Sequence, residues 1–167
     1  MKLTQLIFFL SFIITQSYAQ QLFGHINSQE IVSVMPEAAT AQLSLQQELE
    51  SLEDQAKMMM EEYESQKNDL ELNSATLTDV IRNDKLKSLQ NLEERIMLFQ
   101  QSAQESIRLK EAELFEPILT KIQTAIDIVA KQKGYSYVFD ISSNAGGLVY
   151  KDDSFDMTEL VKKQLNL

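Results

Sequence analysis

Apolar residues recur every three or four positions along a long polar stretch of the chain. From Glu37 to about Glu116 there is no glycine and no proline, and glutamate, glutamine, serine and lysine fill most intervening positions. This spacing is close to the 3.5-residue repeat of a coiled coil, so it predicts a long helix that packs against a partner helix. The stripe consists of Ala38, Ala41, Leu45, Leu49, Leu52, Ala56, Met59, Tyr63 and Leu70.

A second helical stripe follows after a short interruption. The pattern weakens between Leu72 and Asp79, where serine and threonine side chains offer several helix caps, so we expect the chain to reverse there. At ~1.5 Å per residue the two helices form an arm on the order of 50 Å long. The return stripe consists of Leu86, Leu89, Leu92, Ile96, Phe99, Ala103, Ile107 and Leu114.

Short elements precede and follow this hairpin. Residues 22–27 predict a strand, and Ser28 is the expected cap of a short helix over residues 29–34. Pro36 suits the first position of the long helix, because its missing N–H needs no partner there. Pro117 is expected to kink the return helix or to re-space its apolar pattern, and the helix then ends at Gly134. Beyond Pro117 a broader apolar face contains Ile118, Ile122, Ala125, Ile126 and Val129.

The C-terminal part predicts a β-hairpin and a last helix. Residues 135–141 are rich in β-forming side chains, residues 142–147 read as a turn, and Leu148–Tyr150 reads as the returning strand. Asp156 and Glu159 have capping-box spacing, so a short helix is expected to start at Asp156 and to bury Leu160, Val161 and Leu165.

The predicted fold is α+β: a long antiparallel helical hairpin projecting from a small β-strand body. Residues 20–36 and 117–167 supply the body, and residues 37–116 supply the coiled-coil arm. A sheet this small is marginal alone, so we expect several copies to complete it by oligomerisation. The predicted assembly residues are Ile26, Val138, Phe139, Ile141, Leu148 and Val149.

Residues 1–19 are predicted to be a secretory signal peptide. Lys2 gives a positive start, Leu6–Ile14 is apolar, and Ser17–Ala19 fits a small-x-small cleavage site. The apolar run is shorter than the ~20 residues that a membrane span needs. The chain also has no cysteine to carry a lipid. We therefore expect export, cleavage before Gln20, and no stable membrane anchor.

Charge excludes two classes of partner. The chain has a formal net charge of −10, and residues 37–113 alone hold seventeen acidic and eight basic residues, a net of −9. Nucleic acid and anionic lipid are both bound through lysine and arginine, so neither is an expected ligand of the arm. Acidic residues on a helix also often do no more than keep one face of it exposed to water.

The sequence offers no catalytic, metal or cofactor site. His25 is the only histidine, there is no cysteine, and the pair Gly146–Gly147 lies in the predicted turn. A single histidine on a strand is more often a packed residue than a ligand, and the carboxylate pairs lie on solvated segments. We therefore predict a protein that is not an enzyme.

Three adjacent methionines stand out in the middle of the arm. Only about one of Met58, Met59 and Met60 can face the seam between the helices, and methionine suits surfaces that adapt to many partners. Packing within the seam is the simpler alternative. The predicted client-binding set is Met58, Met59, Met60, Tyr63, Leu70, Leu72 and Leu77.

The chain resembles the OmpH-like (Skp) family of periplasmic chaperones over nearly its whole length after the signal. The resemblance rests on four segments in order: residues 24–31, residues 35–37, residues 117–123 and residues 134–140, the last being Gly-Tyr-Ser-Tyr-Val-Phe-Asp. Each segment alone is weakly specific for the family, but the order of the four segments around an acidic, glutamine-rich hairpin is more specific.

The resemblance implies a periplasmic homotrimer whose three arms enclose a cavity. Such a protein holds unfolded outer-membrane proteins without ATP and prevents their aggregation. The best-known members are basic, however, and this chain is acidic, so capture of acidic clients and binding of lipid or lipopolysaccharide are not carried over. A structural coiled-coil adaptor of the cell envelope, binding one folded partner, is the alternative function.

Overall fold

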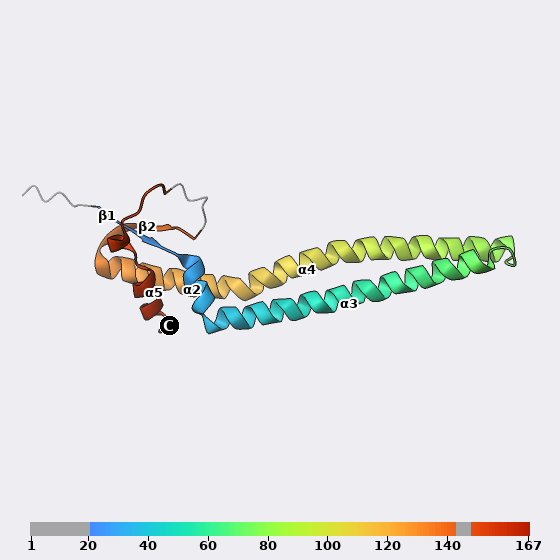
Figure 1. Ribbon diagram of the computed structural model, residues 1–167, viewed down its shortest axis with the longest axis horizontal. Helices are drawn as coiled ribbons and strands as arrows, with labels where there is room; N and C mark the ends of the chain where they lie inside the picture. Colours follow the sequence, from blue (N-terminus) through green and yellow to red (C-terminus); the bar gives the residue numbers. More distant parts are fainter. Residues whose placement is uncertain (1–20, 143–147) are drawn as a thin grey trace, which may run out of the picture.

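The computed structural model describes residues 21–142 and 148–167. A small body lies at one end, and two long helices project from it as a hairpin arm (Figure 1). The predicted signal peptide and residues 143–147 of the predicted turn lie outside the described residues. The elements are β1 (Leu22–Ile26), α2 (Ser28–Val34), α3 (Pro36–Asn73), α4 (Asp79–Lys133), β2 (Tyr135–Asp140), the 3₁₀ turn η2 (Asp153–Phe155) and α5 (Thr158–Gln164).

The chain reverses between α3 and α4 where the sequence predicts it. The Thr78 hydroxyl caps α4 by accepting the Ile81 N–H at 3.4 Å. Arg82 donates to the carbonyl oxygens of Ser74, at 2.9 Å, and Leu77, at 3.4 Å. The end of a helix leaves backbone carbonyl groups without hydrogen-bond donors, and here the Arg82 guanidinium is such a donor. This explains how the reversal forms without glycine.

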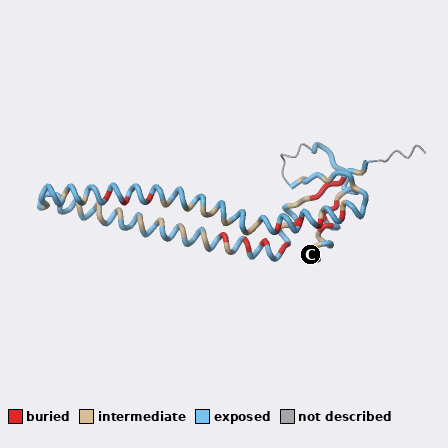
Figure 2. Tube along the Cα trace, turned by 180° about the vertical axis from the view of Figure 1, so that it is seen from behind, coloured by how far each residue is buried: buried red, intermediate tan, exposed pale blue. Residues whose placement is uncertain are grey.

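The body has an apolar core built from both ends of the chain. It joins α2, α5, the first turns of α3, β1 and the last third of α4 (Figure 2). Four of the five apolar residues predicted after Pro117 are buried in it, and Ile126 packs against it. The α4 helix runs on through Pro117, so this proline does not end the helix. The buried set is Ile26, Ile31, Met35, Ala38, Ala41, Ile118, Ile122, Ala125, Val129, Met157 and Val161.

The sheet differs from the predicted hairpin. It has two strands, β1 and β2, which are parallel and pair Gly24 with Val138. Residues 148–150 are exposed and are not a strand in the single chain. The C-terminal segment instead returns to the other edge of β1, where the Met157 N–H donates to the His25 carbonyl oxygen at 2.9 Å. Met157 is fully buried, and its burial favours this path over a return beside β2.

Two of the predicted helix caps also differ. Asn27, not Ser28, caps α2 by accepting the Glu30 N–H at 3.2 Å, and Ser28 donates instead to the Asp140 carboxylate. The last helix begins at Thr158, because the Asp156 carboxylate accepts the Thr158 N–H at 2.8 Å in a turn just before the helix.

The face that α5 buries is narrower than predicted. Val161 is fully buried and Leu165 is half-buried, but Leu160 is exposed. The predicted end of α4 is confirmed, with Gly134 in the left-handed conformation at φ 77°.

Candidate interaction surfaces of the arm and the body

The seam between α3 and α4 is closed at two levels and open between them. Near the body, Ala38, Ala41 and Leu45 of α3 are buried. Further out, Leu89, Leu92 and Ile96 of α4 are buried. In Figure 2 the positions between these two levels are half-buried or exposed, although they continue the same predicted stripe. The stripe therefore predicts which residues face the seam, but not how tightly each level packs.

An apolar opening of about 410 Å³ lies at this middle level. Its floor includes two alanines, whose short side chains leave the space unfilled, and Leu49 at its edge is 40% exposed. We call this the mid-arm pocket. It is lined by Leu49, Leu52, Glu53, Ala56, Phe99, Gln100, Ala103, Gln104 and Ile107.

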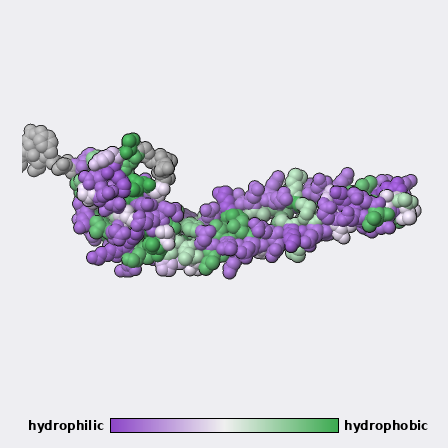
Figure 3. All heavy atoms as spheres, in the orientation of Figure 1, coloured by the Kyte–Doolittle hydropathy of each residue, from purple (hydrophilic) through white to green (hydrophobic). Residues whose placement is uncertain are grey.

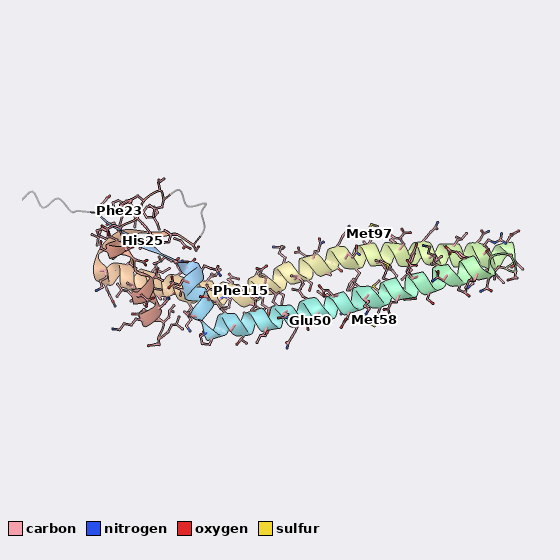
Figure 4. All side chains as sticks on the ribbon, in the orientation of Figure 1. Phe23, His25, Glu50, Met58, Met97 and Phe115 are labelled. Atoms are coloured by element: carbon pink, nitrogen blue, oxygen red, sulfur yellow. The ribbon has the colours of Figure 1, made fainter. Side chains whose placement is uncertain are left out.

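The three methionines lie immediately beyond this pocket. Met59 is half-buried toward the seam, whereas Met58 is 60% exposed and Met60 is 43% exposed. The prediction that about one of the three faces the seam is therefore confirmed. Met97 of α4 lies at the same level of the arm as Met58 and is also exposed (Figure 4). The two helices thus present thioether side chains at one level.

The other predicted client-binding residues divide in two. Tyr63, Leu70 and Leu77 are half-buried, but Leu72, near the tip, is 84% exposed. Their part in binding stays a prediction. The stripe also missed exposed apolar residues that lie off the seam. They are visible in the sequence only as large apolar residues at outer positions of a helix: Leu43, Met97, Leu98 and Leu109. Leu86, which belongs to the predicted return stripe, is also exposed, at 44%. Figure 3 shows apolar side chains scattered among polar ones along the arm.

Charge on the arm is only partly compensated. Arg108 hydrogen-bonds Glu105, which holds the pKa of that carboxyl below its usual value, and Lys85 does the same for Asp69. Lys57 and Lys110 pair within α3 and α4, respectively. Within the described residues the ion pairs leave four carboxylates without a basic partner in the α3 segment that lines the mid-arm pocket: Glu48, Glu50, Glu53 and Asp54. Of these, Glu53 lines the pocket itself.

The body carries a separate aromatic surface on its sheet. Phe23 stacks on Tyr137 with ring centroids 5.4 Å apart, and on Phe139 at 6.3 Å. All three rings are at least 43% exposed. A hollow of about 300 Å³ beside them is also lined by Leu148 and Tyr150. An exposed aromatic patch of this kind is typical of a surface that another chain covers.

The predicted assembly residues lie in three different settings. Phe139, Leu148 and Val149 are exposed on or near the aromatic patch, and Val138 and Ile141 are half-buried. Ile26 is 2% exposed and belongs to the core of the single chain. Their role in assembly stays a prediction.

His25 is packed inside the body, as expected for a lone strand histidine. It is 4% exposed, and its Nε2 has no hydrogen-bond partner within the described structure. Nε2 lies 3.6 Å from the Asp156 carboxylate, which is too long for a hydrogen bond. No group of three or more potential metal ligands occurs in residues 21–142 and 148–167.

The arrangement is that of a helical-hairpin protein with a small mixed body and two exposed apolar surfaces. A model of the OmpH-like outer membrane protein family matches residues 22–165. The chain therefore belongs to the OmpH-like family. This match covers both parts of the body and the whole arm, so it agrees with the resemblance drawn from the sequence.

Two similar proteins extend the comparison. An uncharacterised protein of Aquifex aeolicus (strain VF5) is 28% identical over 144 residues, which is 86% of this chain and 85% of that protein. The crystal structure of a candidate outer membrane chaperone (OmpH-like) from Caulobacter crescentus CB15 superimposes with a TM-score of 0.72 over 87% of this chain and 84% of that one. At 13% identity this second likeness is one of fold alone.

None of the helices in the described part of the chain combines the length and the hydropathy that crossing a membrane requires.

Proposed function

We propose that this protein is a holdase chaperone of the periplasm, which binds unfolded outer-membrane proteins and prevents their aggregation without ATP. The observation that carries the proposal is the arm. It exposes large apolar side chains, singly and among polar ones, along two helices of a family described as OmpH-like outer membrane proteins. Scattered apolar contacts suit the weak and adaptable binding of unfolded chains, whereas a single folded partner favours one contiguous patch.

The proposed assembly is a homotrimer that surrounds its client. The exposed rings of Phe23, Tyr137 and Phe139 support it, because another copy of the chain would remove them from water. The small two-stranded sheet supports it as well, since a sheet of this size is marginal by itself.

The function is tested by dilution of an unfolded outer-membrane barrel from urea. Light scattering is followed with and without the chain from residue 20 onward. We expect suppression of aggregation, saturating near one barrel for three chains, with no effect of added ATP. Several different barrels should be held. Suppression of none of them, even with the protein in molar excess, would overturn the proposal and favour an envelope adaptor that binds one folded partner.

Assembly is tested separately with Val138→Asp. Val138 is half-buried and packs against the core of the body, so a charge at this position is costly. We expect the variant to lose the oligomer or to unfold the body, measured as mass in solution by light scattering and as helix content by circular dichroism. Exposed Leu98→Asp on the arm is the control and should keep the mass of the wild type. An unchanged mass together with normal helix content for Val138→Asp would contradict its assignment to the assembly.

The methionines are tested together by changing Met58, Met59 and Met60 to glutamine. The change keeps the length of the side chains and removes their apolar, polarizable groups. We expect weaker client binding with an unchanged oligomer. Unchanged affinity would assign these residues to the seam alone.

A further inference from the structure

The mid-arm pocket is an apolar cavity that opens between the two arm helices, and the α3 segment that lines it contains four acidic residues. Most of its side chains belong to the predicted seam, yet the space of about 410 Å³ between them is not filled. Phe99 and Ile107 of α4 and Leu52 of α3 are only half-buried. A cavity lined in this way loses contacts that a further apolar group would supply.

The α3 segment that lines the pocket carries charge of one sign. Residues 48–56 of α3 contain four acidic residues and no basic one. Among the described ion pairs, none involves these carboxylates. Across the seam, the acidic Glu105 is already paired with Arg108. This segment of α3 therefore has a formal charge of −4, and Glu53 is the member of the acidic set that lines the pocket itself.

We infer that the mid-arm pocket binds large apolar side chains of extended, cationic segments of unfolded polypeptides. The inference rests on the proposed function and names the class of segment that the arm prefers. The pocket accepts a phenylalanine or leucine side chain, and lysine or arginine residues next to it in the segment face the carboxylates of α3. The observation that decides for this occupant is charge complementarity, because an anionic segment of equal apolarity would meet repulsion at the same place.

The preference is measured with two synthetic peptides of twelve residues. Each contains two phenylalanines among glycine and serine; one carries four lysines and the other four glutamates. Fluorescence anisotropy gives the affinity of each for the whole protein. We expect the cationic peptide to bind at least about fivefold more tightly at 50 mM salt, with the ratio falling as salt is raised, because exposed charges are screened. Equal affinities, or tighter binding of the acidic peptide, would overturn the inference.

The pocket itself is tested by filling it with Ala103→Leu. The added carbon atoms occupy the cavity, so we expect about tenfold weaker binding of the cationic peptide, the value of burying one large side chain. The matched control is Ala39→Leu, which adds the same group at an exposed position of α3 outside the pocket. Filling should also leave the melting temperature of the arm equal or higher. A filled pocket with wild-type affinity would show that the opening is a packing gap only.

The carboxylates are tested by changing Glu48, Glu50 and Glu53 to glutamine and Asp54 to asparagine. We expect the cationic and acidic peptides to bind about equally to this variant. The control removes four acidic groups elsewhere on the arm, in Glu64→Gln, Glu71→Gln, Asp84→Asn and Glu111→Gln. It should keep most of the preference, because its carboxylates lie away from the pocket. Equal loss in both variants would assign the preference to net charge and overturn the site.

The two proposals fail in different ways. If the wild type does not suppress aggregation of any unfolded barrel, the holdase function fails, whatever the peptides do. If it suppresses aggregation and the Ala103→Leu variant does so with the same client and peptide affinities, the function stands and the pocket is contradicted.

Discussion

The body and the arm use apolar residues in opposite ways. In the body, Ile31 and Val161 are fully buried between elements from the two ends of the chain. In the arm, residues of similar size are left in water, with Met58 60% exposed and Leu98 55% exposed. Burial of apolar area holds a fold together, whereas apolar area kept at the surface is available to a partner. The difference supports the proposal that the body maintains the structure and that the arm binds.

The largest expected effect comes from removing a buried side chain of the body. Ile31→Ala should lower the free energy of unfolding by about 2–5 kcal/mol, because it deletes fully buried carbon atoms and leaves a cavity. Ile81→Ala makes the same deletion on the arm, where the side chain is 47% exposed, and should cost less than about 1 kcal/mol. Urea unfolding followed by circular dichroism measures both. Equal costs would contradict the contrast between the two regions.

A smaller loss is expected from adding a methyl group to the body at Gly24. A Cβ there would lie 2.7 Å from the Sδ of Met157 and 3.0 Å from the ring of Tyr135. Since Met157 is fully buried and cannot move freely, Gly24→Ala should cost about 1–3 kcal/mol. In Gly134→Ala the added Cβ has no atom within 4 Å, so only the strain of an alanine at a φ of 77° remains. This strain should lower the free energy of unfolding by about 1 kcal/mol. Thermal unfolding of both variants tests the difference, and a Gly24→Ala protein as stable as wild type would contradict the packing.

The arm should respond more to the loss of a cap than to the loss of a similar group in mid-helix. Thr78→Ala removes the hydroxyl that caps α4 and should cost about 1 kcal/mol. Thr40→Ala is the matched control, because its hydroxyl only bonds the Pro36 carbonyl within α3. Helix content followed on heating measures both. A control as costly as the cap variant would show that the reversal does not depend on Thr78.

The smallest expected effect is a pH dependence at Asp140. Partial burial raises the pKa of this carboxyl, but hydrogen bonds from Ser28 and Ser142 outweigh burial and hold it below the ordinary value of 3.8. A lowered pKa stabilises the fold above the unfolded-state value, and this contribution is lost as pH falls below about 4. Asp140→Asn should therefore be less stable than wild type at pH 7, by well under about 1 kcal/mol because the group is largely exposed.

The check is the urea midpoint of both proteins at pH 7 and at pH 3. The difference between them should shrink at the lower pH. A difference that stays constant would contradict this role of the Asp140 carboxylate.

Elements that depend on local pattern were predictable from the sequence, and those that depend on long-range competition were not. The two arm helices, the reversal near Thr78 and the end of α4 at Gly134 follow from periodicity and capping. The pairing of β1 with β2 does not, because Leu148–Tyr150 has an equally good strand pattern. Which segments pair depends on where Met157 is buried, and the local sequence pattern does not predict that burial.

The candidate surfaces divide in the same way. Periodicity predicts that Met59 faces the seam and that Met58 and Met60 do not, as the structure has it. The mid-arm pocket was not predictable, because Ala56 and Ala103 continue the stripe as well as a larger residue would. Only the distance between the two helices reveals that these small side chains leave space.

The parallel pairing of β1 with β2 has a consequence for the order of folding. Leu22 pairs with Tyr135, so the first strand to be synthesised has no partner until most of the chain exists. Closing so long a loop is costly in entropy unless something shortens it. The helices α3 and α4 do so, because contacts at the reversal are local in sequence and each added turn brings the two ends nearer. The arm thus acts as a folding template: a chain truncated before Tyr135 should still form the hairpin and never complete the body.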